Sequence, residues 1–226
     1  MPRFAIYYIP KAEEEFYRLG TSIVSYDVHS GKHVKMPEGF QPEWVDRVEL
    51  YGFHLTIGCP IDFNFGHLRY IEKEIDDILK CFNPEHKFTL SQTMDTFPWL
   101  IGKAILLRYD PNDYLKIFHT LMLTLAQKYG TGSFYIERLY NNPKQYEKPY
   151  MVNRILKFYN YPYILDDWTP HFTLLDNYNI GEKHQEIIQY ITDMFIKYKE
   201  IIVDTISLLI QTKDGDNWRI YKEYTR

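Results

Sequence analysis

Two short segments of the chain each place a histidine and a threonine two residues apart. The first, YGFHLTIGCP, contains His54 and Thr56, and the second, TPHFTLLDNY, contains His171 and Thr173. In a strand, residues i and i+2 point to the same face. Each segment therefore presents an imidazole and a hydroxyl to one side, and if the segments meet, four polar groups surround one small site.

These four groups suit the cleavage of a phosphodiester. Because imidazole has a pKa of about 6.5, one ring can take a proton from the attacking water or hydroxyl while the other gives a proton to the leaving oxygen. Threonine hydroxyls donate hydrogen bonds to phosphate oxygens as charge builds in the transition state. We interpret His54 and His171 as catalytic residues, with either as the acid, and Thr56 and Thr173 as phosphate-binding residues.

Other chemistries lack their usual patterns in this sequence. A zinc site needs three or four ligands at suitable spacing, and neither segment offers a third nearby. Gly-x-Ser-x-Gly and a glycine-rich phosphate loop are both missing. We expect no metal and no cofactor. A single His-x-Thr is more often structural, but two copies at the start of similar units favour catalysis. The remaining histidines are interpreted as surface or structural residues: His29, His33, His67, His86, His119 and His184.

Composition limits the class of partner. The chain has 226 residues, 45% of them hydrophobic and 25% charged, as in a soluble globular domain. Its net charge is −4 and it has no Lys/Arg cluster, which argues against binding a long nucleic-acid duplex. We expect a monomer that binds a small nucleotide, a cyclic phosphate or an RNA end.

The sequence also indicates the compartment. The two cysteines have neither metal-ligand nor disulfide-framework spacing, so a reducing cytoplasm is the default. We expect no signal peptide and no membrane partner, because no apolar run approaches about 20 residues.

The two segments begin similar series of elements. The first is followed by a helix over 68–82 and strands over 88–94 and 100–109. The second is followed by a helix over 184–198 and a hairpin of strands over 202–211 and 218–224. Trp99 lies 45 residues after His54, and Trp218 lies 47 after His171. This order predicts one domain, 1–226, of two similar lobes that each contribute one His-x-Thr strand, although any α+β protein yields comparable runs.

Further elements complete the prediction. Alternating apolar residues predict a strand over 3–9, and helices are expected over 12–19 and 113–128. The segments 27–48 and 135–159 are polar and are candidates for covering a cleft, the second with helix near 152–158.

The paired motifs resemble the signature of the 2H phosphoesterase superfamily, which includes 2′-5′ RNA ligase-like proteins and cyclic nucleotide phosphodiesterases. The resemblance implies a bilobal, pseudo-twofold α+β fold in which two antiparallel sheets face a central cleft with helices outside. It also implies metal-independent action on 2′,3′-cyclic or 2′-5′ phosphodiesters.

The nearest resemblance is to the uncharacterised branch of this superfamily associated with phosphonate-utilisation operons. RFAIY at the start of the chain is similar to that branch's RYAIY-like strand, LYGFHLTIG to RYGFHATLK, and NYPYILDDWTPHFTLL to its GYPYV and FHxTL motifs. Ile57-Gly58 and Thr169-Pro170 depart from the pattern, because they stand where basic residues are expected. Both departures remove positive charge near the phosphate.

Residues around the four central groups are candidates for substrate binding. Tyr7 and Tyr51 either bind phosphate or lie at the rim. Lys103 and Arg108 either supply positive charge or lie on an exposed sheet face. Four further aromatic residues either stack on a base or pack in the core: Phe53, Tyr163, Trp168 and Trp218.

Three functions remain open from sequence. The first is a metal-independent phosphodiesterase acting on nucleotides or short oligonucleotides. The second is a hydrolase of a cyclic sugar phosphate in phosphonate metabolism. The third is a non-catalytic nucleotide-binding or sequestering protein, which the missing basic residues favour.

Overall fold

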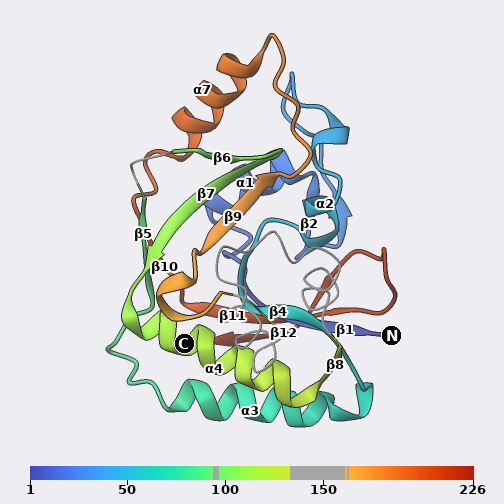
Figure 1. The fold of residues 1–226 in the computed structure, drawn as a ribbon, viewed down its shortest axis with the longest axis vertical. Coiled ribbons are helices and arrows are strands. Elements are labelled where there is room, and N and C mark those ends of the chain that lie inside the picture. Colours follow the sequence, from blue (N-terminus) through green and yellow to red (C-terminus); the bar gives the residue numbers. More distant parts are fainter. Residues whose placement is uncertain (94–96, 133–160, 162) are drawn as a thin grey trace, which may run out of the picture.

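The computed structural model describes residues 1–93, 97–132, 161 and 163–226. Within these ranges the chain is a mixed α+β protein built on a large, curled antiparallel sheet (Figure 1). Its helices are α1 (Glu15–Val24), α2 (Val48–Tyr51), α3 (Leu68–Lys80), α4 (Asp113–Tyr129) and α7 (His184–Phe195), with short 3₁₀ turns at Pro42–Trp44, Phe65–His67 and Leu165–Asp167. None of the helices in these ranges is long and apolar enough to cross a membrane.

Ten strands of the described residues form the main sheet. Eight of them follow the order β10 (Glu200–Ile202), β5 (Thr89–Gln92), β7 (Ala104–Pro111), β9 (His171–Leu175), β4 (Leu55–Phe63), β1 (Arg3–Tyr8), β11 (Thr205–Gln211) and β12 (Arg219–Thr225). β6 (Trp99–Ile101) pairs with β7, and β8 (Gly130–Gly132) pairs with β4. A separate hairpin joins β2 (Tyr26–Asp27) and β3 (Lys32–His33).

Helices cover this sheet with apolar faces. In α3 the buried residues Leu68, Ile71 and Ile75 recur at helical spacing, and in α7 Ile187, Ile191 and Phe195 do the same. α4 begins at Asn112, whose side chain accepts the Leu115 N–H at 3.0 Å. Figure 1 shows α3 and α4 side by side next to β4, β1, β11 and β12, with α7 at the far end of the molecule.

The sheet differs from the expected architecture. The resemblance implied two sheets that face a cleft, whereas all the described strands except the β2–β3 hairpin form one sheet, because β4 and β9 pair at Leu55 and Phe172. The order of elements along the chain also differs from their order in the sheet. β5 and β7 lie on the side of β9, and β11 and β12 lie on the side of β4, because each hairpin crosses to the other half of the sheet after its helix.

Most predicted elements agree with the structure. The strand at the N-terminus, the helices over 68–82, 113–128 and 184–198, and the final hairpin are confirmed within a few residues. The first motif differs: Val48–Tyr51 is helical and the strand begins only at Leu55, so His54 precedes it. The first helix begins at Glu15 rather than residue 12. The prediction for 135–159 lies outside the described residues.

Candidate active site

The two His-x-Thr motifs lie on neighbouring strands. Leu55 of β4 pairs antiparallel with Phe172 of β9. Extending this register by one residue on each side sets His54 opposite Thr173 and Thr56 opposite His171. The two histidines are then diagonal neighbours, with α-carbons about 7–8 Å apart by strand geometry. All four residues are partly exposed on one face of the sheet, whereas Leu55 and Phe172 are completely buried on the other.

Both imidazoles are held by the same backbone contact. Nδ1–H of His54 donates to the carbonyl oxygen of Gly52 at 2.8 Å, and Nδ1–H of His171 donates to that of Thr169 at 2.8 Å. Each carbonyl lies two residues before its histidine. Because Nδ1 carries the hydrogen, Nε2 of each neutral ring keeps its lone pair for proton transfer. Thr56 Oγ1 lies 3.4 Å from Nε2 of His54.

Burial changes how readily these rings take a proton. Desolvation, together with a smaller effect of the charge on a protonated His171, lowers the pKa of His54 from 6.5 to about 4. Burial also lowers the pKa of His171. A charge on one ring lowers the pKa of the other, as expected for two imidazoles that lie in one site.

Local sequence explains the approach to each histidine. α2 ends at Gly52, which adopts φ 72°, a backbone conformation that favours glycine, and its carbonyl turns toward the His54 ring. Before His171, Pro170 has no N–H and its carbonyl accepts the Tyr109 N–H at 3.0 Å. Thr169-Pro170, which departs from the pattern of the 2H resemblance, is thus a segment that enters β9 with its backbone held by a hydrogen bond.

The other departure, Ile57-Gly58, lies at an irregularity in β4. The register between β1 and β4 shifts between Ile6 and Tyr7, next to Gly58. A β-carbon at Gly58 would come within 3.1 Å of the Ile6 side chain. Glycine here permits close packing of the two strands at the bulge. A basic side chain at this position would require Ile6 to move.

A row of polar residues extends the site across the sheet. Register pairs place Glu223 opposite Ser207, Ser207 opposite Tyr7 and Tyr7 opposite Thr56. On the other half of the sheet, Arg108 of β7 lies directly opposite His171. The Ser207 hydroxyl is completely buried and donates to Glu223 at 3.5 Å. Sequence reasoning missed Ser207 and Glu223. They lie on the same face as the site because of the way β11 and β12 pair in the sheet.

Arg108 restores positive charge beside the second histidine. Directly opposed residues of an antiparallel pair share a face, so the guanidinium lies on the same side as His171. Its Cζ is 5.2 Å from the centre of the Trp99 ring, which supports it from one side. Its buried Nε has no hydrogen-bond partner among the described residues. Lys103, by contrast, lies in the exposed turn between β6 and β7 with its amine 3.4 Å from Asn177.

The predicted aromatic residues divide into two groups. Tyr7 stacks on His54 with ring centres 3.9 Å apart, and Tyr51 lies 5.8 Å from the same ring. Trp218 is completely buried behind them, 6.1 Å from Tyr7 and 5.7 Å from Tyr51, so it packs in the core. Phe53 is also completely buried and stacks on Phe172.

Trp168 and Tyr163 lie against α4 instead. Trp168 is nearly buried and stacks on His119 with ring centres 4.0 Å apart, and the Tyr163 carbonyl lies 3.2 Å from Nε2 of His119. Tyr163 is 43% exposed. For Trp168 the packing alternative holds, and its ring is not open to a base.

Two positioning residues were not found from sequence. His119 of α4 is completely buried, and its Nδ1 lies 2.6 Å from the carbonyl oxygen of Ile57, the residue after Thr56. Asp176, just after β9, accepts N–H groups of Arg47 and Val48 at the start of α2. His119 thus links α4 to the first motif, and Asp176 links the end of β9 to the helix that precedes the first motif. A histidine at an apolar helix face was the available signal for His119.

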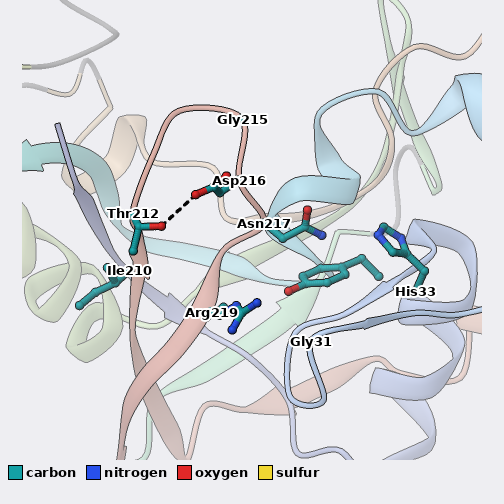
Figure 2. A pocket seen from close by; sticks show the side chains of 9 residues that line it. Gly31, His33, Ile210, Thr212, Gly215, Asp216, Asn217 and Arg219 are labelled. Carbon is teal, nitrogen blue, oxygen red and sulfur yellow. Dashed lines mark hydrogen bonds between the residues drawn. The ribbon is translucent and has the colours of Figure 1, made fainter.

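Two pockets flank this part of the sheet. One of about 640 Å³ lies between the β2–β3 hairpin and the end of the β11–β12 hairpin, where Thr212 donates to Asp216 and Arg219 points inward (Figure 2). None of its lining residues was predicted for the site. A second pocket of about 420 Å³ includes Tyr51 in its wall. Across the described ranges, no group of three or more His, Cys, Asp and Glu residues is placed to bind a metal ion.

Comparison of the sequence with models of protein families and with curated proteins gives no match.

Proposed function

We propose that this protein is a phosphodiesterase that uses two histidines as general base and general acid, without a metal, on a phosphate held by two threonines. One observation carries the proposal. The Leu55–Phe172 pair brings two His-x-Thr motifs, 117 residues apart in the chain, onto adjacent strands of one face. The matching Nδ1 contacts of His54 and His171 support a pseudo-twofold arrangement of the 2H kind.

The proton roles follow from the two environments. His54, with its pKa lowered to about 4, is neutral at working pH, so we assign it as the base that takes a proton from the attacking water at Nε2. His171, whose pKa burial also lowers, takes the other role and donates from Nε2–H to the leaving oxygen. Thr56, Thr173 and Arg108 are placed to stabilise the charge that develops on the phosphate oxygens.

The proposed substrate is a nucleotide or short oligonucleotide with a 2′,3′-cyclic or 2′-5′ phosphodiester bond. This choice rests on the resemblance of both motifs to the 2H superfamily and on the net charge of −4, which disfavours a long duplex. A hydrolase of cyclic sugar phosphates has the same site chemistry and remains the alternative. The Arg108–His171 pair favours turnover over simple sequestration, because it places positive charge beside the proposed acid.

The test is turnover by the purified protein of three substrate classes: cyclic mononucleotides, 2′-5′ oligonucleotides and cyclic sugar phosphates, followed by mass spectrometry with and without EDTA. We expect multiple turnovers that EDTA does not reduce. His54→Ala and His171→Ala should each lower the rate by about 10²–10⁴-fold, and the double variant by little more, because the pair acts as a unit.

The matched control is His86→Ala, which removes an exposed histidine that stacks on Tyr114. It should retain full activity. Urea unfolding of all variants checks that lost activity is not lost folding. Either site variant retaining the wild-type rate, or binding of nucleotide without product, would refute the proposal.

A further inference from the structure

The second pocket offers a basic subsite next to the proposed catalytic residues. It has a volume of about 420 Å³ and its lining residues include Arg3 and Arg47. Tyr51 also lines it, and the Tyr51 ring lies 5.8 Å from His54. One aromatic side chain thus borders both the pocket and the site, so a single bound molecule can occupy both.

The sheet register sets the distance between the pocket and the proposed catalytic residues. Arg3 and Tyr7 are four residues apart on β1 and share its site face, and they pair with Gln211 and Ser207 of β11. Four residues of strand span about 13 Å. Since Tyr7 stacks on His54, this span separates Arg3 from the tyrosine beside the histidine, and it favours a phosphate other than the one that the histidines would cleave.

The lining groups indicate what the pocket binds. Two guanidinium groups favour a phosphate, to which arginine can donate two hydrogen bonds at once. Arg3 already forms an ion pair with Asp214, an exposed residue of the β11–β12 turn, so an incoming anion would compete with a solvated carboxylate.

Gln211 supplies a second, independent indication. It is only 2% exposed, and its Nε2 donates to the Asp216 carbonyl at 2.6 Å, which fixes the amide orientation. Gln211 lines the pocket, and its buried Oε1 has no hydrogen-bond partner within the described part of the chain. A buried acceptor without a donor is costly, and a sugar hydroxyl next to a phosphate would satisfy it.

We propose that the pocket of Arg3, Arg47, Tyr51 and Gln211 binds a second phosphate of the substrate together with its adjoining sugar hydroxyl. The inference rests on the proposed function for the location of the scissile phosphate. It specifies the substrate class: an oligonucleotide of at least two nucleotides, in preference to a cyclic mononucleotide.

The experiment compares a 2′,3′-cyclic mononucleotide with a dinucleotide ending in the same cyclic phosphate. Wild-type kcat/KM should be at least about tenfold higher for the dinucleotide, the order expected for one charge-assisted phosphate contact. In the Arg3→Gln/Arg47→Gln double variant this preference should fall below about twofold, while kcat/KM for the mononucleotide stays within about twofold of wild type. Arg69→Gln, which removes an exposed arginine of α3, is the control and should keep the preference.

A binding measurement separates this inference from the proposed function. Calorimetric titration of the His54→Ala protein with a nucleoside 3′,5′-bisphosphate and a nucleoside 3′-monophosphate needs no turnover. Tighter binding of the bisphosphate that disappears in the Arg3/Arg47 variant supports the subsite even if no substrate is cleaved. Equal affinities for the two ligands, or a preference that survives loss of both arginines, would overturn it.

Discussion

Leu55 of β4 pairs with Phe172 of β9, and this pair joins the two halves of the sheet. Each of these residues lies between the histidine and the threonine of its motif. Their side chains face the core, where Phe172 stacks on Phe53 at 4.8 Å and Phe16 meets both rings edge-on at 5.1 Å. The relative position of the two catalytic candidates is therefore set by aromatic packing beneath them.

This packing predicts an unusual result at Gly20. Alanine in the interior of a helix is normally more stable than glycine by about 0.5–1 kcal/mol. A β-carbon at Gly20 of α1 would instead come within 2.4 Å of the Phe53 ring, and overpacking of this kind costs about 1–3 kcal/mol. We expect Gly20→Ala to lower the free energy of unfolding, measured in urea, by about 1–2 kcal/mol. Gly181→Ala, with nothing within 4 Å, should be neutral, and a stabilised Gly20→Ala would contradict the packing described.

Sequence reasoning succeeded where local pattern decides structure. The period of 3.6 residues located α3, α4 and α7, because each of these helices buries one face. β1 and β11 are buried on both faces, and their apolar residues next to turn residues located them. The partners of each strand are set by long-range contacts. That β7 lies beside β9 and β11 beside β1 could not be read from order along the chain.

The same distinction applies to the candidate site. His54, Thr56, His171 and Thr173 could be chosen from two copies of one spacing. Ser207 and Glu223 carry no such signal, because they reach the site face only through strand register. Trp168 and Trp218 were ambiguous for a further reason: a large aromatic ring suits both a core and a base-stacking surface, and only burial separates the two.

Arg108 should matter for the reaction more than for binding. Placed opposite His171, its guanidinium stabilises charge that grows on the phosphate as the bond breaks. We expect Arg108→Gln to lower kcat by about 10–100-fold with a smaller change in KM, measured with the best substrate of the screen. Arg108→Lys should restore part of the loss, because it keeps the charge but not the planar group that lies over Trp99.

Arg69→Gln is again the matched control, because it removes one positive charge from α3 on the exposed surface. If Arg108→Gln and Arg69→Gln both keep the wild-type kcat, Arg108 is only a residue of the sheet surface, and the role proposed for it in the reaction is wrong.

The depressed histidine pKa values predict an acidic pH optimum. The base, His54, is neutral above a pKa of about 4, and the acid, His171, is protonated below a pKa that burial lowers from 6.5. The productive combination needs a neutral His54 and a protonated His171, and burial places both pKa values below 6.5. We expect kcat/KM to peak on the acid side of pH 6.5 and to fall by about tenfold per pH unit well above the pKa of His171. Initial rates from pH 4 to pH 8 would measure this, and a profile that is flat from pH 6 to pH 8 would exclude the assigned acid.

His119 links folding to pH through a conflict in its hydrogen bonds. Its ring is completely buried between the carbonyl oxygens of Ile57 and Tyr163, at 2.6 and 3.2 Å. A neutral imidazole donates to only one of them. Burial nevertheless lowers the pKa of His119 from 6.5 to about 4, so the folded protein holds the ring neutral.

Between pH 4 and pH 6.5 the unfolded chain therefore binds more protons at His119 than the folded protein does, and stability must fall as pH falls through this range. The neutral His119 ring contributes on the order of 3 kcal/mol to the free energy of unfolding. This contribution is fully present above pH 6.5 and is lost near pH 4. Replacement by phenylalanine keeps a ring for Trp168 to stack on but removes the titration. We expect urea unfolding of His119→Phe at pH 4.5, 5.5, 6.5 and 7.5 to show a shallower loss of stability toward acid than wild type. His86→Ala, which removes an exposed histidine, is the control and should keep the wild-type slope. If stability falls with pH equally steeply in His119→Phe and in wild type, the folded protein does not resist protonation of the His119 ring, and the prediction is wrong.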